Sequence, residues 1–135
     1  APGSELLELA KLPGIRIEAD VTDIFALLRR AWVAVAPMRQ GCGVKNKVLE
    51  AWSVGVPVVM TETAANGIQV DEELKELVCR GSSALTEETA RLLTDKKRML
   101  DLGRLSYERV RARHSWSAVG RSFDRLLREN SLLGN

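Results

Sequence analysis

The chain has 135 residues, of which 45% are hydrophobic and 28% charged, a composition typical of one globular domain with one core. A formal net charge of +2 is too small to indicate a nucleic-acid-binding protein. Two cysteines without a CxxC pair argue against a disulfide scaffold, and no apolar run reaches the roughly 18 residues of a membrane span.

The first half of the chain alternates helix-like and strand-like patterns. In order, it predicts a helix over 5–11 with Ser4 as N-cap, a strand over 15–19, a helix from a Thr22 or Asp23 cap to Arg30, a buried strand over 31–36, a helix over 45–54 ended by Gly55, and a buried strand over 57–61. Apolar strands separated by helices predict an α/β domain with a Rossmann-like parallel sheet and flanking helices.

The second half is predicted to be mostly helical. In order, it predicts a loop over 64–67, a short helix or turn over 71–76, an edge strand over 77–79, and helices over 84–94, 95–113 and 116–132. Trp32 and Trp52 flank the first core strand and the following helix, and core packing is expected for both. Residues 95–129 hold ten basic and five acidic residues, which indicates either a solvated helix face or contact with an anionic membrane surface.

A glycine-containing turn joins the strand over 31–36 to the helix over 45–54. Its two glycines, Gly41 and Gly43, are accompanied by the cations Arg39, Lys45 and Lys47. Such turns between a strand and a helix start hold phosphate groups in α/β proteins. Cations in a first helical turn oppose the helix dipole by about 0.3–1 kcal/mol each, a conflict that a bound anion would remove. The turn therefore predicts a diphosphate site.

Glu50 follows Lys47 by three residues, so both side chains share one face of the predicted helix. One interpretation is a surface ion pair of little energetic value. The other is a binding site at the carboxyl ends of the strands, where parallel sheets hold their ligands. Arg39 has the same two interpretations, as an exposed loop residue or as a bidentate phosphate clamp.

Residues 21–68 resemble the C-terminal, donor-binding domain of family-4 (group 1) glycosyltransferases of the GT-B fold. The motifs that carry this resemblance are Val21-Thr22-Asp23, Ala31-Trp32-Val33-Ala34-Val35-Ala36-Pro37-Met38-Arg39, Gly41-x-Gly43-x-x-x-Lys47-Val48-Leu49-Glu50-Ala51, Gly55-Val56-Pro57-Val58-Val59 and Asn66-Gly67-Ile68. The central motif is most similar to the subgroup that includes sugar transferases of bacterial polysaccharide export loci. With later matches, the resemblance extends over nearly the whole chain.

The resemblance implies a nucleotide-sugar donor, a UDP- or GDP-sugar, as substrate, and no metal or other cofactor. Glu50 would bind the donor ribose. The backbone amides of Val44, Lys45 and Asn46, with Gly41 and Gly43, would face the diphosphate or sugar, Lys47 and Arg39 would add positive charge, and the loop at Val21 would lie near the base. Cys42 replaces a glutamate that the commoner family motif uses to contact the sugar, so the sugar cannot be inferred. No catalytic residue is identified.

The resemblance also implies that residues 1–135 are a single nucleotide-sugar-binding domain from a larger retaining glycosyltransferase, a hexosyltransferase whose first strand and N-terminal acceptor domain lie outside this sequence. The fragment alone is expected to be inactive. We expect a cytoplasmic protein, with peripheral contact to the inner face of the membrane or a lipid-linked acceptor, no nucleic-acid partner, and a homodimer through an exposed sheet edge. The alternatives are a non-catalytic nucleotide-sugar-binding module of the same fold and a GT-B-type epimerase.

Overall fold

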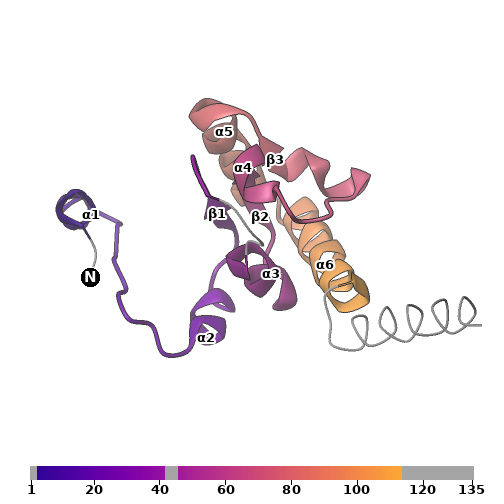
Figure 1. Cartoon of the computed structure of the whole chain (residues 1–135), viewed down its shortest axis with the longest axis horizontal. Coiled ribbons are helices and arrows are strands. Elements are labelled where there is room, and N and C mark those ends of the chain that lie inside the picture. The colour runs from indigo at the N-terminus through magenta and orange to yellow at the C-terminus, as the bar shows by residue number, and fades with distance from the viewer. Residues whose placement is uncertain (1–2, 42–45, 114–135) are drawn as a thin grey trace, which may run out of the picture.

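The computed structural model describes residues 3–41 and 46–113, which form helices around a small sheet (Figure 1). In chain order the elements are α1 (Ser4–Leu9), α2 (Ile24–Leu28), β1 (Ala34–Ala36), α3 (Asn46–Ser53), β2 (Val58–Thr61), α4 (Glu62–Ala65), the 3-10 helix η1 (Glu72–Leu77), β3 (Val78–Cys79), α5 (Gly81–Thr94) and α6 (Lys96–Arg113). The helix predicted over 116–132 lies outside the described residues. The alternation of strands and helices confirms the predicted α/β class.

The sheet has three parallel strands in the order β1-β2-β3. Ala34 begins the first ladder by donating its backbone N–H to the carbonyl of Pro57 at 2.9 Å. The central strand, β2, carries Val58, Val59 and Met60, each at most 2% exposed. A strand covered on both faces explains the continuous apolar run in the sequence, and the predicted strands over 57–61 and 77–79 are confirmed.

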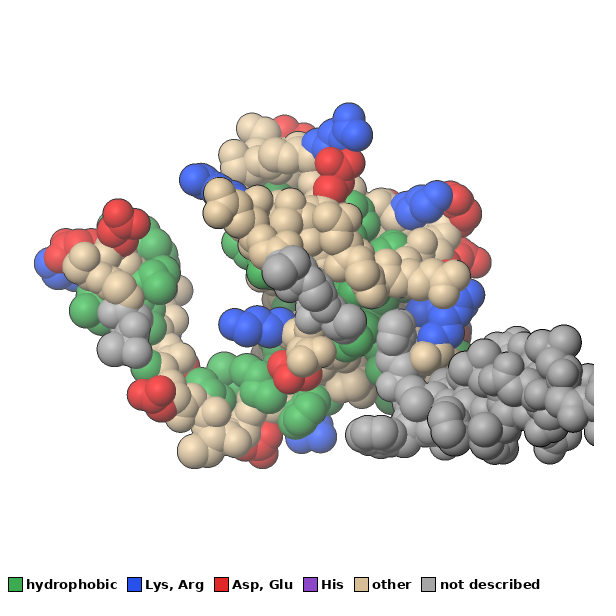
Figure 2. Space-filling view, in the orientation of Figure 1, with side chains coloured by type: hydrophobic (Ala, Val, Ile, Leu, Met, Phe, Trp, Pro, Cys, Tyr) green, Lys and Arg blue, Asp and Glu red, His purple; other side chains and the backbone are tan. Residues whose placement is uncertain are grey.

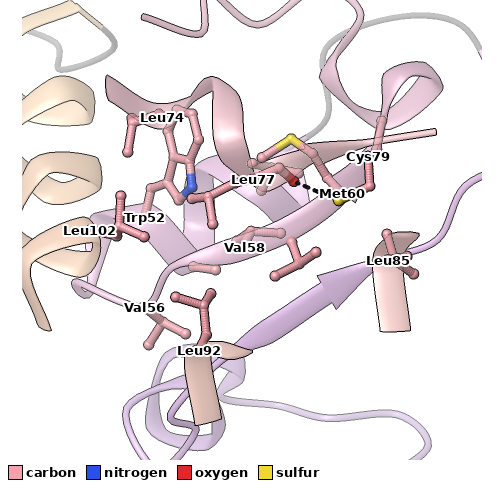
Figure 3. Packing of buried hydrophobic residues seen from close by; sticks show 14 of the residues in the cluster. Trp52, Val56, Val58, Met60, Leu74, Leu77, Cys79, Leu85, Leu92 and Leu102 are labelled. Carbon is pink, nitrogen blue, oxygen red and sulfur yellow. Dashed lines mark hydrogen bonds between the residues drawn. The ribbon is translucent and has the colours of Figure 1, made fainter. Parts of the chain in front are cut away.

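The core is built around Trp52 of α3, which is fully buried (Figure 3). In Figure 3 Leu74 of η1 lies next to this indole and Leu102 of α6 lies nearby. Its Nε1 has no hydrogen-bond partner among the described residues, so it contributes through apolar packing. Leu92 and Met99 also lie in this core, which confirms the periodicity predicted for the helices over 84–94 and 95–113.

Helix α3 ends at Ser53, and Gly55 just beyond it has φ +77° and donates its N–H to the carbonyl of Trp52 at 3.0 Å. This is the predicted left-handed helix end. The close approach of α6 to the end of α3 depends on two glycines, Gly55 and Gly103. A Cβ added to Gly103 of α6 would lie 2.3 Å from the carbonyl oxygen of Gly55, so the two helices pack backbone against backbone.

Ion pairs hold α6 against α5, against η1 and against the residue before η1. Arg98 Nη2 donates to Glu88 Oε1 of α5 at 2.5 Å and also pairs with Glu76 of η1. Further along α6, Arg113 Nη1 donates to Asp71 at 2.8 Å, and Arg109 pairs with the same carboxylate. Because Glu88 and Asp71 are largely buried, these pairs fix the position of α6 more firmly than surface pairs would.

The N-terminal segment, residues 3–33, contacts this body through α2 and the residues after it, whereas residues 3–22 stand away from it (Figure 1). The strand predicted over 15–19 is wrong: the segment is extended but pairs with no strand, because it does not reach the sheet. Ser4 is the first helical residue rather than the cap, and Gly3 in the cap position supplies no side-chain bond. The Asp23 cap is confirmed, since its carboxylate accepts the N–H of Ala26 at 3.0 Å.

Strand β1 is shorter and less buried than predicted. It covers three residues instead of six, and the Val35 side chain is 44% exposed. Trp32, expected in the core, is 60% exposed. Both corrections agree with the position of β1 at the edge of the sheet, where among the described residues it has a strand partner on one side only. Figure 2 shows hydrophobic side chains on the surface of the N-terminal segment.

Two element ends also differ from the sequence predictions. Helix α2 ends at Leu28 rather than Arg30. The loop predicted over 64–67 begins within a short helix, α4, whose N-cap is Thr61. The Thr61 hydroxyl accepts the N–H of Ala64 at 3.2 Å, and this local bond initiates a helical turn directly after β2. The 3-10 helix η1 confirms the predicted short helix over 71–76.

Candidate functional site

A cavity of about 700 Å³ lies where β1 ends and α3 begins. This volume is within the roughly 300–1,000 Å³ that small-molecule sites occupy. The lining residues come from α2, β1, the loop after β1, α3 and β2; they are Ile24, Leu28, Ala34, Val35, Ala36, Pro37, Met38, Gly41, Asn46, Lys47, Val48, Glu50 and Val58. The cavity is therefore at the strand ends where parallel sheets bind ligands.

Four residues singled out by the sequence line this one cavity: Gly41, Asn46, Lys47 and Glu50. Gly41 has φ +141°, a backbone conformation that residues with a Cβ rarely adopt. Arg39 and Val21 are exposed and do not belong to the lining. Cys42, Gly43, Val44 and Lys45 lie outside the described residues.

Helix α3 supplies the polar side of the cavity. Lys47 lies in its first turn and Glu50 follows one turn later, and no carboxylate occurs in the first turn. Both side chains line the cavity without forming an ion pair with each other, although their spacing would allow one. Lys47 is exposed and Glu50 is half-buried. The helix start thus places a cation ahead of a carboxylate that can accept hydrogen bonds.

The opposite side of the cavity is apolar. Ile24 and Leu28 of α2 are half-buried and face the cavity with Met38 and Val35. Sequence reasoning did not assign Ile24 or Leu28 to the site. The available signal was their spacing of four residues behind the Asp23 cap, which puts both on one face of a short helix. A flat, apolar ligand group would fit this wall.

Thr61 at the end of β2 was also missed. Its hydroxyl donates to the carbonyl of Met38 at 2.7 Å while accepting the N–H of Ala64. One side chain thereby ties the loop after β1 to the end of the neighbouring strand. Because Met38 lines the cavity, Thr61 positions the cavity wall without belonging to it.

The perturbed titrating groups lie in the packed body and not in the cavity lining. Burial raises the pKa of the Cys79 thiol, and the nearby Glu88 carboxylate raises it further. The hydrogen bond to Glu76 is the largest cause of a raised pKa at Arg98, and burial opposes it. Within the described ranges, no three His, Cys, Asp or Glu side chains cluster as metal ligands would. None of the helices described here has the length and apolarity required to cross a membrane.

A family model describing glycosyl transferases of group 1 matches residues 2–95. The chain belongs to the group 1 glycosyltransferase family. The matched range includes the whole cavity lining and the three strands. No curated protein and no solved structure gives a significant match. Family membership supports glycosyl transfer in general as the chemistry to which this group 1 domain contributes.

Proposed function

We propose that the cavity between β1, α2 and α3 binds the nucleotide-diphospho-sugar donor of a retaining glycosyltransferase. The observation that carries this proposal is the meeting of Gly41, Asn46, Lys47 and Glu50 in one cavity at the strand ends. Residues 1–135 would then be the donor-binding domain of a hexosyltransferase, and an N-terminal domain would supply the acceptor site.

In the proposed complex, Glu50 accepts hydrogen bonds from the two ribose hydroxyls. A half-buried carboxylate suits this role because hydrogen bonds to a charged group contribute about 1.5–3 kcal/mol. The base lies against the apolar wall of Ile24 and Leu28, close to the loop that contains Val21. A UDP- or GDP-sugar contains both the ribose and the base.

The diphosphate lies at the start of α3. Lys47, with Lys45 and Arg39 from the preceding turn, stabilises the negative charge that develops on the leaving diphosphate when the glycosidic bond to it breaks. Backbone amides of Val44 to Asn46, together with the turn glycines Gly41 and Gly43, complete the phosphate contacts. This proposal assigns the charge stabilisation to side chains and amides, with no metal ion.

The setting of the activity is part of the same proposal. The transferase acts in the cytoplasm, at the inner face of the membrane, in cell-surface polysaccharide synthesis. The open edge of β1 supports a homodimer formed by strand pairing, since unpaired strand edges attract other chains. Donor binding does not require this dimer.

Isothermal titration calorimetry of the 135-residue chain with UDP and GDP tests the donor site. We expect one nucleotide to bind, and Glu50→Gln to weaken its binding by about tenfold or more, because a charged acceptor becomes a neutral amide. Glu87→Gln is the matched control, since this carboxylate is 68% exposed on α5 and outside the cavity. Unchanged binding by the Glu50→Gln variant, or the absence of binding to both nucleotides, would contradict the proposal.

A further inference from the structure

The outward face of α6 has a composition that its packing does not explain. Met99, Leu102, Gly103 and Ser106 are buried on the inward face. Beside this buried face, at 3.6 residues per turn, six exposed residues fall within an arc of about 100°. We call them the α6 stripe; they are Lys96, Lys97, Leu100, Arg104, Tyr107 and Arg111.

Two apolar side chains lie within the α6 stripe. Leu100 is 58% exposed and Tyr107 is 41% exposed, and a spacing of seven residues puts them on one line along the helix. An exposed Leu and an exposed Tyr among cations combine groups that can enter a membrane interface with groups attracted to anionic headgroups. Neither side chain contributes to the core.

The cations of α6 divide into two groups. Arg98, Arg109 and Arg113 pair with the largely buried carboxylates that hold α6 to the body. In contrast, the four cations of the α6 stripe project outward, and the Lys97 side chain is 90% exposed. The stripe cations are therefore not required for packing.

Two acidic residues border the α6 stripe without neutralising it. Asp101 pairs with Lys97 at 3.3 Å and Glu108 pairs with Arg104 at 3.2 Å, in both cases four residues apart on one helix. Such exposed pairs contribute little and are screened by salt. No ion pair involves Lys96 or Arg111 among the described residues, so the stripe retains a net positive charge.

We propose that the α6 stripe docks on an anionic lipid surface, with the helix axis parallel to the membrane. The four cations would lie over lipid headgroups, and Leu100 and Tyr107 would enter the interface between them. The apolar pair favours a lipid surface over a nucleic acid, whose phosphates would need the cations alone. No stripe residue lines the cavity at β1, so this inference is independent of the proposed donor site.

Vesicle co-sedimentation of the 135-residue chain tests the docking surface. We expect binding to phosphatidylglycerol vesicles and not to phosphatidylcholine vesicles. Raising the ionic strength from about 0.1 M to about 1 M shortens the Debye length from roughly 10 Å to 3 Å, which should release the chain. Substituting Lys96, Lys97, Arg104 and Arg111 by Gln should weaken binding by about 100-fold or more.

A second quadruple variant provides the matched control. Lys11, Arg16, Arg29 and Arg30 are also four exposed cations, and two of them likewise form exposed ion pairs, with Glu8 and Glu18. Changing these four to Gln gives the same net charge as the stripe variant. Circular dichroism checks that both variants retain the fold.

Three results would overturn the proposal. The first is no binding of the unsubstituted chain to anionic vesicles. The second is an equal loss in the two quadruple variants, which would indicate net charge rather than a docking surface. The third is tighter binding to duplex DNA than to vesicles, with the α6 stripe required for it. A loss of about tenfold in Leu100→Ser, at unchanged charge, would support the apolar insertion.

Discussion

The N-terminal segment and the core of the body use leucine in opposite ways. In α1 and the turn after it, Leu6, Leu7, Leu9 and Leu12 are each 46–52% exposed. In the body, the leucines at 74, 77, 92 and 102 are at most 4% exposed. Both sets follow helical spacing, so the spacing alone does not decide burial. An apolar helix face becomes core only where a second surface lies against it.

We expect the body to unfold as one cooperative unit and the N-terminal segment to open separately from it. The body has a parallel sheet, two long helices and buried ion pairs that connect segments far apart in sequence. In residues 3–33, α1 makes no substantial contact with another element and α2 packs on α3, and segments with few such contacts open at low free-energy cost. The predictions below compare matched substitutions and run from the largest expected effect to the smallest.

Replacing Trp52 and Trp32 in turn tests the division most directly. Trp52→Ala should lower the free energy of unfolding by about 3–5 kcal/mol, because a fully buried indole leaves a cavity. Trp32→Ala removes the same kind of side chain at a position where it is 60% exposed. This variant should change the free energy of unfolding by at most about 0.5 kcal/mol. Urea unfolding followed by far-UV circular dichroism measures both. Equal losses would mean that Trp32 is covered in solution and that the N-terminal segment belongs to the cooperative unit.

Neighbouring glutamates on α5 give a comparison within the body. Glu88→Ala removes the buried acceptor of Arg98 and should cost about 1.5–3 kcal/mol, the range for hydrogen bonds to charged groups. Glu87→Ala affects a carboxylate that is 68% exposed, and should cost at most about 0.5 kcal/mol. Thermal unfolding of the two variants in the same buffer provides the measurement. If Glu87→Ala proved the more damaging, the assignment of Glu88 to the interior would be wrong.

Gly103→Ala tests the contact between α6 and α3. Alanine favours helix formation, but its Cβ would lie 2.3 Å from the backbone oxygen of Gly55. Overpacking of this kind costs about 1–3 kcal/mol, so we expect a net loss of stability. The control is Gly3→Ala, where no atom lies within 4 Å of the added Cβ. A stabilised Gly103→Ala variant in chemical denaturation would indicate that α6 and α3 pack further apart.

Two helix caps, in each of which a side-chain oxygen accepts a backbone N–H, allow the body and the N-terminal segment to be compared. Thr61 caps α4 in the body and also holds Met38, whereas Asp23 caps α2 in the N-terminal segment. Thr61→Ala should reduce the free energy of unfolding by about 1–2 kcal/mol. Asp23→Ala should leave that global value within about 0.5 kcal/mol, because α2 is short and contains no fully buried residue. Hydrogen exchange of Ala26 and Ala64 measures each cap locally, and equal global effects would contradict the division.

The smallest effect concerns Cys79 in β3. Burial raises the pKa of this thiol above its ordinary value of 9.0, so the folded chain retains the thiol proton where the unfolded chain has lost it. Its contribution to stability is complete below pH 9.0 and is lost as the pH rises from there through the folded-state pKa. In a Cys42→Ser background, Cys79→Val should remove this part of the pH dependence. Urea titrations at several alkaline pH values compare the two chains, and parallel curves would refute the assignment.

Part of the fold follows from local sequence patterns. The buried strand over 57–61, the helices over 84–94 and 95–113, and the helix end at Gly55 were all predicted correctly. In each case the determinants lie within one segment: a continuous apolar run, a repeat of three or four residues, or a residue suited to positive φ. The Asp23 cap belongs to the same group, since its bond reaches only three residues.

The errors occur where an element depends on a distant partner. The segment over 15–19 has strand spacing but no strand beside it, and β1 is short because it is paired on one side among the described residues. Trp32 was expected to be buried because a tryptophan beside a strand usually packs. No pattern near these residues encodes the missing neighbour.

For the candidate site, the sequence by itself singled out Gly41 and the order of Lys47 and Glu50 on one helix face. Only the tertiary structure decided that α2 supplies Ile24 and Leu28 to the same cavity, and that Thr61 holds its wall. It also separated the cations of α6 into those that hold the helix and those that project outward. The physical reason is the same throughout: local spacing sets the direction of a side chain, while its partner depends on the packing of segments far apart in the chain.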